Sequence, residues 1–319
     1  MKKFLKILLF IVLAVVVILG VSAAVINSQD LPTYEVQNPD YVAKADSAGL
    51  VRGKKFVNML CAGCHLNPET GRLTGALMED APEFGTLYSQ NITHDKEYGI
   101  GNWTDGEILY LLRTGILPNG RYTPPYMAKL PHMSDEDINN VIAFLRSDDD
   151  LVAATNVPDK PCEPSFLTKF LCRVAFKPLP FPEKSIETPD GSDKLDLGKY
   201  LTINLDCWTC HSPSFEELNV LEPEKTPGYL SGGNQSLIDT EGNQVLSLNI
   251  TPDKETGLGN WTEEQFVQAL KYGVMKGEHA LQFPMEPYTE LTDEEASAIF
   301  TYLQSVPSIT NKVERTIYE

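Results

Sequence analysis

The chain has 319 residues, of which 42% are hydrophobic and 22% charged. This balance supports one large or two ordinary domains and excludes general disorder. Asp and Glu total 44 against 26 Lys and Arg, for a formal net charge of -18. Because so acidic a body repels nucleic acid and anionic lipid heads, we expect no nucleic-acid binding and redox partner proteins with basic docking surfaces.

The N-terminus contains three lysines followed by an uncharged run of 20 residues, Ile7 to Ile26. At about 1.5 Å per helical residue, this run spans roughly 30 Å, the thickness of a hydrocarbon core. We therefore expect residues 1–26 to form a transmembrane anchor, with a cleaved signal as the alternative. The positive-inside rule keeps the lysines cytoplasmic. This predicts a single-pass protein of the bacterial inner membrane, with a stalk at 27–47 and domains on the periplasmic side.

Two motifs of the form Cys-x-x-Cys-His follow, Cys61-Ala62-Gly63-Cys64-His65 and Cys207-Trp208-Thr209-Cys210-His211. Cysteines three apart on one helical turn can each form a thioether with a vinyl group of one porphyrin, while the adjacent imidazole ligates its iron. The motifs predict two covalently bound haem c groups, with His65 and His211 as proximal ligands. The alternatives are a redox-active disulfide, which needs a βαβ context that the sequence lacks, and a structural zinc site, which needs four converging soft ligands.

An internal repeat supports a duplicated unit. The segment from Asn91 to Thr104 recurs from Asn249 to Thr262, identical at 11 of 14 places and shifted by 158. Thr104 with Glu107, and Thr262 with Gln265, form the pattern of a capping box, so both units are predicted to be helical. The capped helices that follow are expected to begin at Ser134 and Thr292.

The same shift places Met127 on Met285. A methionine thioether well downstream of the histidine is the usual sixth iron ligand in small electron-transfer cytochromes, so we predict both methionines as distal ligands. His94, His132 and His279 could instead complete a bis-histidine centre. None of the three has a histidine at the position shifted by 158.

The predicted fold is all-α, with two tandem class I cytochrome c domains at 48–150 and 191–319. Gly53 and Gly198 are expected to let the helix before each motif cross another helix closely. Between the domains, residues 151–190 contain seven prolines, which block a continuous helix and predict a semi-rigid linker. Cys162 and Cys172 lie outside both motifs in an oxidising compartment, which predicts a structural disulfide.

The segments at 249–262 and 283–288, together with both motifs, resemble the cytochrome c subunits of membrane-bound alcohol, aldehyde and gluconate dehydrogenases. The resemblance implies an electron carrier rather than an enzyme, which passes electrons from a periplasmic dehydrogenase to the respiratory chain. It also implies His65 and His211 as proximal ligands and Met127 and Met285 as distal ones. Family members commonly have three haem domains, whereas this chain has two motifs.

Two alternatives share the pair of motifs. A dihaem cytochrome c peroxidase needs one haem that opens to peroxide, so its halves should differ at the sixth ligand, whereas these halves match. A dihaem subunit of a haem-copper oxidase would also transfer electrons and would differ only in its partner.

Overall fold

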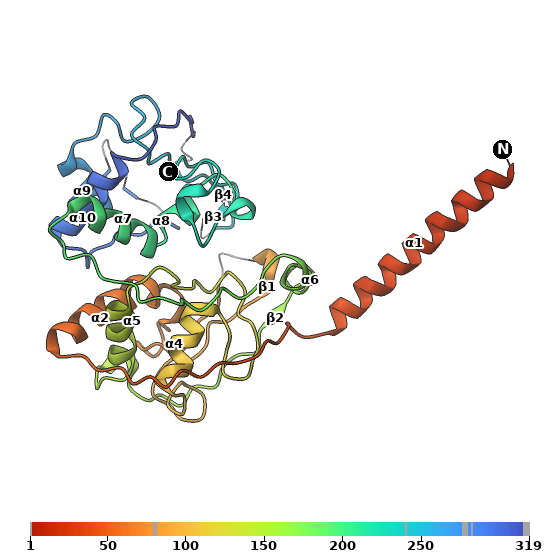
Figure 1. Ribbon diagram of the computed structural model, residues 1–319, viewed down its shortest axis with the longest axis horizontal. Helices are drawn as coiled ribbons and strands as arrows, with labels where there is room; N and C mark the ends of the chain where they lie inside the picture. Colours follow the sequence, from red (N-terminus) through yellow and green to blue (C-terminus); the bar gives the residue numbers. More distant parts are fainter. Residues whose placement is uncertain (1, 79–81, 240, 276–279, 282, 315–319) are drawn as a thin grey trace.

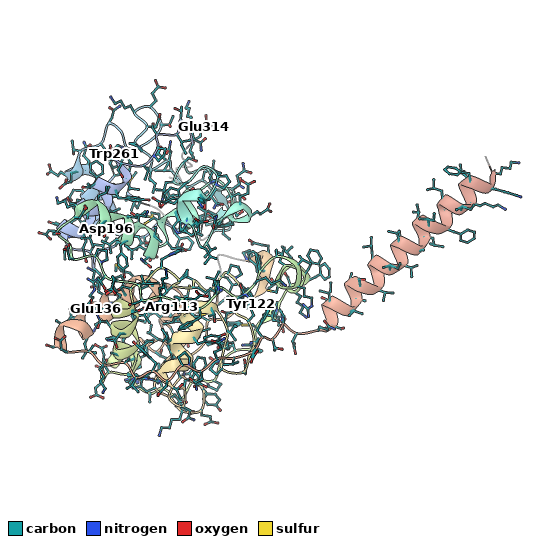
Figure 2. All side chains as sticks on the ribbon, viewed as in Figure 1. Arg113, Tyr122, Glu136, Asp196, Trp261 and Glu314 are labelled. Atoms are coloured by element: carbon teal, nitrogen blue, oxygen red, sulfur yellow. The ribbon has the colours of Figure 1, made fainter. Side chains whose placement is uncertain are left out.

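The computed structural model describes residues 2–78, 82–239, 241–275, 280–281 and 283–314. Helix α1 (Lys2–Ser28) buries none of its residues and projects from the body of the protein (Figures 1 and 2). It is long and apolar enough to cross a membrane. The rest of the described chain is a body of helices and loops with two short antiparallel strand pairs.

The first half, residues 47–152, contains the first Cys-x-x-Cys-His motif and the first copy of the repeat. Its elements are α2 (Ser47–Leu60), α3 (Ala62–His65), η1 (Pro82–Phe84), β1 (Gly85–Thr86), α4 (Asp105–Thr114), α5 (Asp135–Leu145) and η2 (Asp150–Val152). The expected capping box at Thr104 and Glu107 begins α4. Ser134 caps α5 by accepting from the N–H of Asp137.

The second half, residues 194–314, repeats this arrangement. Its elements are α7 (Lys194–Asn204), α8 (Cys207–His211), η3 (Phe215–Glu217), η4 (Pro223–Lys225), β3 (Leu237–Ile238), β4 (Gln244–Val245), α9 (Glu263–Tyr272) and α10 (Asp293–Leu303). Strands β3 and β4 pair with each other. Capping boxes begin both α9, at Thr262 and Gln265, and α10, at Thr292 and Glu295, so these sequence expectations are confirmed.

The predicted close helix crossings are also confirmed. A Cβ atom at Gly53 of α2 would lie 2.0 Å from the carbonyl oxygen of Asn140 on α5. A Cβ atom at Gly198 of α7 would lie 1.9 Å from the carbonyl oxygen of Ala298 on α10. Real Cβ atoms do not approach so closely, so only glycine permits these two crossings.

The segment predicted as a stalk lies against the first half. Tyr34 donates its backbone N–H to the carbonyl of Gly120 (2.8 Å), and Ala43 donates to the carboxylate of Asp105 (2.9 Å). Residues 30–44 therefore tie the end of α1 to the first half and do not act as a free spacer.

The linker contains structure that the sequence analysis did not predict. Strand β2 (Glu163–Pro164) pairs with β1, and helix α6 (Phe166–Val174) follows it. Cys162 and Cys172 are not joined by a disulfide in the structure, so their pairing stays a prediction. The Cys162 thiol exchanges hydrogen bonds with the backbone of Tyr88, whereas Cys172 lies fully buried on the inner face of α6.

The two halves meet through a pair of equivalent contacts. Lys55 of α2 forms an ion pair with Glu295 at the start of α10, and Tyr200 of α7 donates to Asp137 at the start of α5 (2.6 Å). Lys55 and Tyr200 each lie two residues after the crossing glycine of their helix, and Asp137 and Glu295 are related by the 158-residue shift. The interface is therefore pseudo-twofold, with the same patch used on both sides.

Candidate haem sites

Each Cys-x-x-Cys-His motif forms one short helix. In the first half, α2 leads directly into the motif: the N–H of Cys61 donates to Val57, and the N–H of His65 donates back to the carbonyl of Cys61 (2.8 Å). One turn therefore contains both cysteines and the histidine. In the second half, α8 begins at Cys207 after Asp206, which has a left-handed backbone with φ of 59°.

The histidines of the two motifs have equivalent backbone partners. Nδ1 of His65 lies 2.7 Å from the carbonyl oxygen of Gln90, and Nδ1 of His211 lies 2.7 Å from that of Leu248. A carbonyl only accepts, so each Nδ1 bears the proton and each Nε2 keeps its lone pair. Burial lowers the pKa of both imidazoles, which favours the neutral ring. A neutral ring with a free Nε2 and a bonded Nδ1 is suited to an axial iron ligand.

The repeated Asn-Ile-Thr segment explains where these carbonyls come from. Gln90 and Leu248 differ by 158 and directly precede Asn91 and Asn249. The side-chain oxygen of Asn91 accepts two bonds from Thr93, from the backbone N–H (2.9 Å) and from the hydroxyl (2.7 Å). Asn249 makes the same two bonds with Thr251. The repeat thus fixes the loop that presents the acceptor to each histidine.

Sequence reasoning did not identify Gln90 and Leu248, because a backbone acceptor has no residue-type signature. The only feature of the sequence that pointed to these two residues was their position directly before each copy of the repeat. Nδ1 of a ligating histidine needs an acceptor, and a rigid loop with the same register in both halves is a natural source of one.

The two alternatives to haem are not supported by the structure. Burial raises the pKa of Cys61 and of Cys207 to about 12, the opposite of the depressed pKa of a redox-active Cys-x-x-Cys. Within the described residues, no three His, Cys, Asp or Glu side chains converge on a possible metal position.

The predicted distal methionines occupy equivalent places. Met127 and Met285 are both partly buried against the hydrophobic cluster, in loops that lead to α5 and α10. Their ligation of iron remains a prediction.

The other histidines have separate surroundings. Nε2 of His94 lies 2.5 Å from the carbonyl of Leu145, and that of His132 lies 2.7 Å from the carbonyl of Val220. His94 is partly buried rather than fully exposed. His279 lies outside the described residues.

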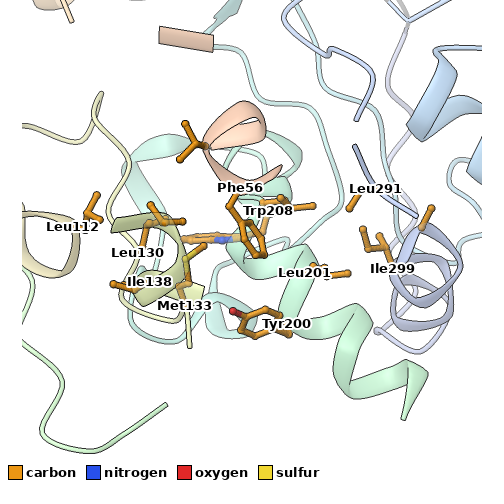
Figure 3. Close-up of a cluster of buried hydrophobic side chains, with 14 of the residues drawn as sticks. Phe56, Leu112, Leu130, Met133, Ile138, Tyr200, Leu201, Trp208, Leu291 and Ile299 are labelled. Carbon is orange, nitrogen blue, oxygen red and sulfur yellow. The ribbon is translucent and has the colours of Figure 1, made fainter. Parts of the chain in front are cut away.

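The second motif contributes a core residue to the contact between the halves. Trp208 is 4% exposed and belongs to one hydrophobic cluster that contains residues of both halves. Figure 3 shows its ring beside Phe56, Leu130 and Met133 of the first half. The Asn204 side chain on α7 also donates to the backbone of His132 (3.4 Å). The segment that bears the second motif is therefore packed directly on the first half.

Residues 50–148 match the family model for cytochrome c. The chain therefore contains a cytochrome c domain, a class defined by covalently bound haem c and electron transfer.

Curated relatives extend the similarity across both halves. The chain is 29% identical to the fructose dehydrogenase cytochrome subunit of Gluconobacter japonicus over 78% of this chain and 50% of the relative. It is 29% identical to the cytochrome c subunit of the quinone alcohol dehydrogenase of Gluconobacter oxydans, over 93% and 60%. A dihaem cytochrome c-type protein of Cereibacter sphaeroides is 27% identical, over 78% and 82%. The chain thus resembles cytochrome subunits of dehydrogenases and spans only half to three fifths of the two dehydrogenase subunits.

Proposed function

We propose that the chain is a membrane-anchored dihaem cytochrome that relays electrons on the periplasmic side from a dehydrogenase to the respiratory chain. The observation that carries the proposal is the matched pair of proximal histidines. Each follows a Cys-x-x-Cys turn and donates Nδ1–H to the carbonyl that precedes the repeated Asn, at 2.7 Å in both halves. The similarity to dehydrogenase cytochrome subunits supports the choice of partner.

The cysteines, histidine and methionine of each site would have different roles in binding haem c. The two cysteines tether the porphyrin, and the Nδ1–H bond keeps the histidine in one tautomer and raises the basicity of Nε2. Met127 and Met285 supply the sixth ligand. Haem c, if bound, would supply reversible one-electron exchange, with a potential that depends on its protein ligands and on burial.

The pseudo-twofold interface suits a relay. The motif helices come next in the chain after α2 and α7, the helices that make the reciprocal contacts between the halves. The ion pair of Lys55 with Glu295 and the bond from Tyr200 to Asp137 fix the halves relative to each other. A fixed arrangement allows transfer between the two sites without domain rearrangement.

The acidic surface supports a basic partner. With 44 acids against 26 bases, the chain attracts a positively charged docking surface over about a Debye length. We expect the rate of electron exchange with the partner to fall as ionic strength rises. A rate that is indifferent to salt would contradict steering by charge.

The proposal is tested by spectroscopy on the purified full chain. A pyridine haemochrome assay is expected to give two haems c per chain, and each of Met127→Leu and Met285→Leu should remove the methionine-to-iron charge-transfer band of one centre. Leucine conserves side-chain volume, so packing is largely kept. Met59→Leu is the matched control and should leave both bands intact. A colourless chain, or one haem per chain, would contradict the proposal, and full bands in either variant would contradict that ligand.

A further inference from the structure

Helix α6 lies at the foot of the apolar helix α1. The ammonium group of Lys169 donates to the backbone carbonyl of Asn27 (2.7 Å), and the guanidinium of Arg173 donates to that of Asp30 (2.6 Å). Figure 1 shows α6 beside the end of α1 that joins the body of the protein. These bonds place α6 at the level where the chain leaves the apolar run.

The polarity of α6 is opposite to that expected of a surface helix. Its buried residues are Thr168 and Cys172, which face the first half. Its large apolar side chains are exposed, namely Phe166 (43%), Leu167 (42%), Phe170 (39%) and Val174 (57%). The rings of Phe166 and Phe170 also stack, with centroids 6.0 Å apart. An outward apolar face on a helix already packed on its other side requires an apolar partner.

The charge of this segment differs from that of the rest of the chain. Residues 165–177 contain Lys169, Arg173 and Lys177 and no Asp or Glu, in a chain with a net charge of -18. A helix with an apolar face flanked by basic residues is typical of the interface between water and an anionic bilayer. Long basic side chains there extend toward the lipid headgroups.

We propose that α6 is an interfacial helix that lies in the outer leaflet surface beside the exit of α1, with Phe166, Leu167, Phe170 and Val174 in the lipid. The inference rests on α1 crossing the membrane, as in the proposed function. The bilayer is the partner because α1 emerges at this level and α6 is bonded to the first residues outside it. With α1 and α6 together, the first half is held at the membrane by two elements and has a fixed orientation toward it.

The test uses photocrosslinking of the full haem-containing chain in nanodiscs of phosphatidylcholine and phosphatidylglycerol. The photoreactive residue p-benzoylphenylalanine replaces Phe170, with Phe10 of α1 as the positive control. Tyr272 is the matched negative control, because it is an exposed aromatic residue (53%) on α9 of the second half. Mass spectrometry then identifies each adduct.

We expect lipid adducts at positions 10 and 170, each several-fold above the yield at 272. Adducts at 10 but not at 170 would overturn the inference and leave the anchor intact. Adducts of 170 with a second copy of the chain would also overturn it, whereas the absence of adducts at 10 would overturn anchor and inference together. In nanodiscs of phosphatidylcholine alone, the yield at 170 should fall, and an unchanged yield would exclude a role for the basic flank. The haem content of each sample is measured separately, so failure of the proposed function is distinguishable.

Discussion

The two halves of the chain reach the same histidine geometry by different routes. In the first half, α2 continues directly into the motif, with eight positions from Gly53 to Cys61. In the second half, nine positions separate Gly198 from Cys207, and the additional residue is accommodated by Asp206 in a left-handed conformation. The distance from Nδ1 to its carbonyl is nevertheless 2.7 Å in both halves. The helix crossing and the loop that presents the carbonyl are thus the same in both halves. The segment from the crossing glycine to the first cysteine of the motif differs in length.

A second difference concerns one basic residue at equivalent positions. Arg113 and Lys271 are related by the 158-residue shift and pair with Asp135 and Asp293, which are related by the same shift. Arg113 also donates to two backbone carbonyls, those of Leu130 (2.8 Å) and Met133 (2.7 Å). Lys271 donates to the carboxylate of Asp293. Arg113 thus joins Asp135 to two backbone carbonyls of the first half.

The helix crossings should give the largest effect and should affect both halves alike. Gly53→Ala and Gly198→Ala each place a methyl group against a carbonyl oxygen about 2 Å away, and each should lower the free energy of unfolding by about 3 kcal/mol. Denaturant unfolding followed by circular dichroism measures the loss. Gly63→Ala is the control, because a Cβ there meets nothing within 4 Å. If Gly53→Ala or Gly198→Ala matched this control, the crossing would not be tight.

Exchange of the two basic residues should separate the halves. Arg113→Lys removes the donors to the carbonyls of Leu130 and Met133, so we expect a loss of between about 2 and 3 kcal/mol. Lys271→Arg keeps its pairing and should change stability by less than about 0.5 kcal/mol. Both are measured as changes in the free energy of unfolding. Equal losses would show that the added bonds of Arg113 contribute nothing.

The reciprocal interface contacts should differ in strength, because one is an ion pair. Lys55→Met leaves Glu295 without its cation and should cost about 2 kcal/mol, whereas Tyr200→Phe removes one bond to Asp137 and should cost about 1 kcal/mol. Lys199→Met is the control on α7, because its ion pair is exposed and should be worth less than about 0.5 kcal/mol. Thermal unfolding of the three variants measures the order of these losses in stability. A larger loss for Tyr200→Phe than for Lys55→Met would contradict the comparison.

The smallest effect is expected at Asp206, in the segment between α7 and the second motif. Burial raises the pKa of Asp206 from 3.8 to about 6, so the folded state binds more protons than the unfolded state between these values. Stability from the protonated carboxyl is therefore lost as pH rises, by about 1 kcal/mol between roughly pH 5 and 7. Asp206→Asn should abolish this loss, since asparagine also tolerates a left-handed backbone. In the first half, the residue before the motif is Leu60, which has no titratable group. We therefore expect no equivalent pH dependence there. A pH profile shared by variant and parent would contradict the assignment.

Much of the local structure could be predicted from short sequence patterns. The caps at Thr104, Thr262 and Thr292 depend on residues within one helical turn, and the structure confirms all three. Helix α6 could also have been found, because Ser165 is a capping residue and Phe166, Phe170 and Val174 follow helical spacing. The neighbouring prolines masked this signal, since they lie outside the helix and do not interrupt it.

The sequence by itself determined the two Cys-x-x-Cys-His motifs, which predict haem attachment because thioether formation needs two cysteines and a histidine within one helical turn. It also determined the duplication, because the 158-residue shift is a property of residue order. Only the tertiary structure decided which carbonyls orient His65 and His211, that strand β2 of the linker pairs with β1, and that Lys55 and Tyr200 make equivalent contacts. These features join residues far apart in the chain, and backbone acceptors and packing distances depend on where the folded chain brings them together.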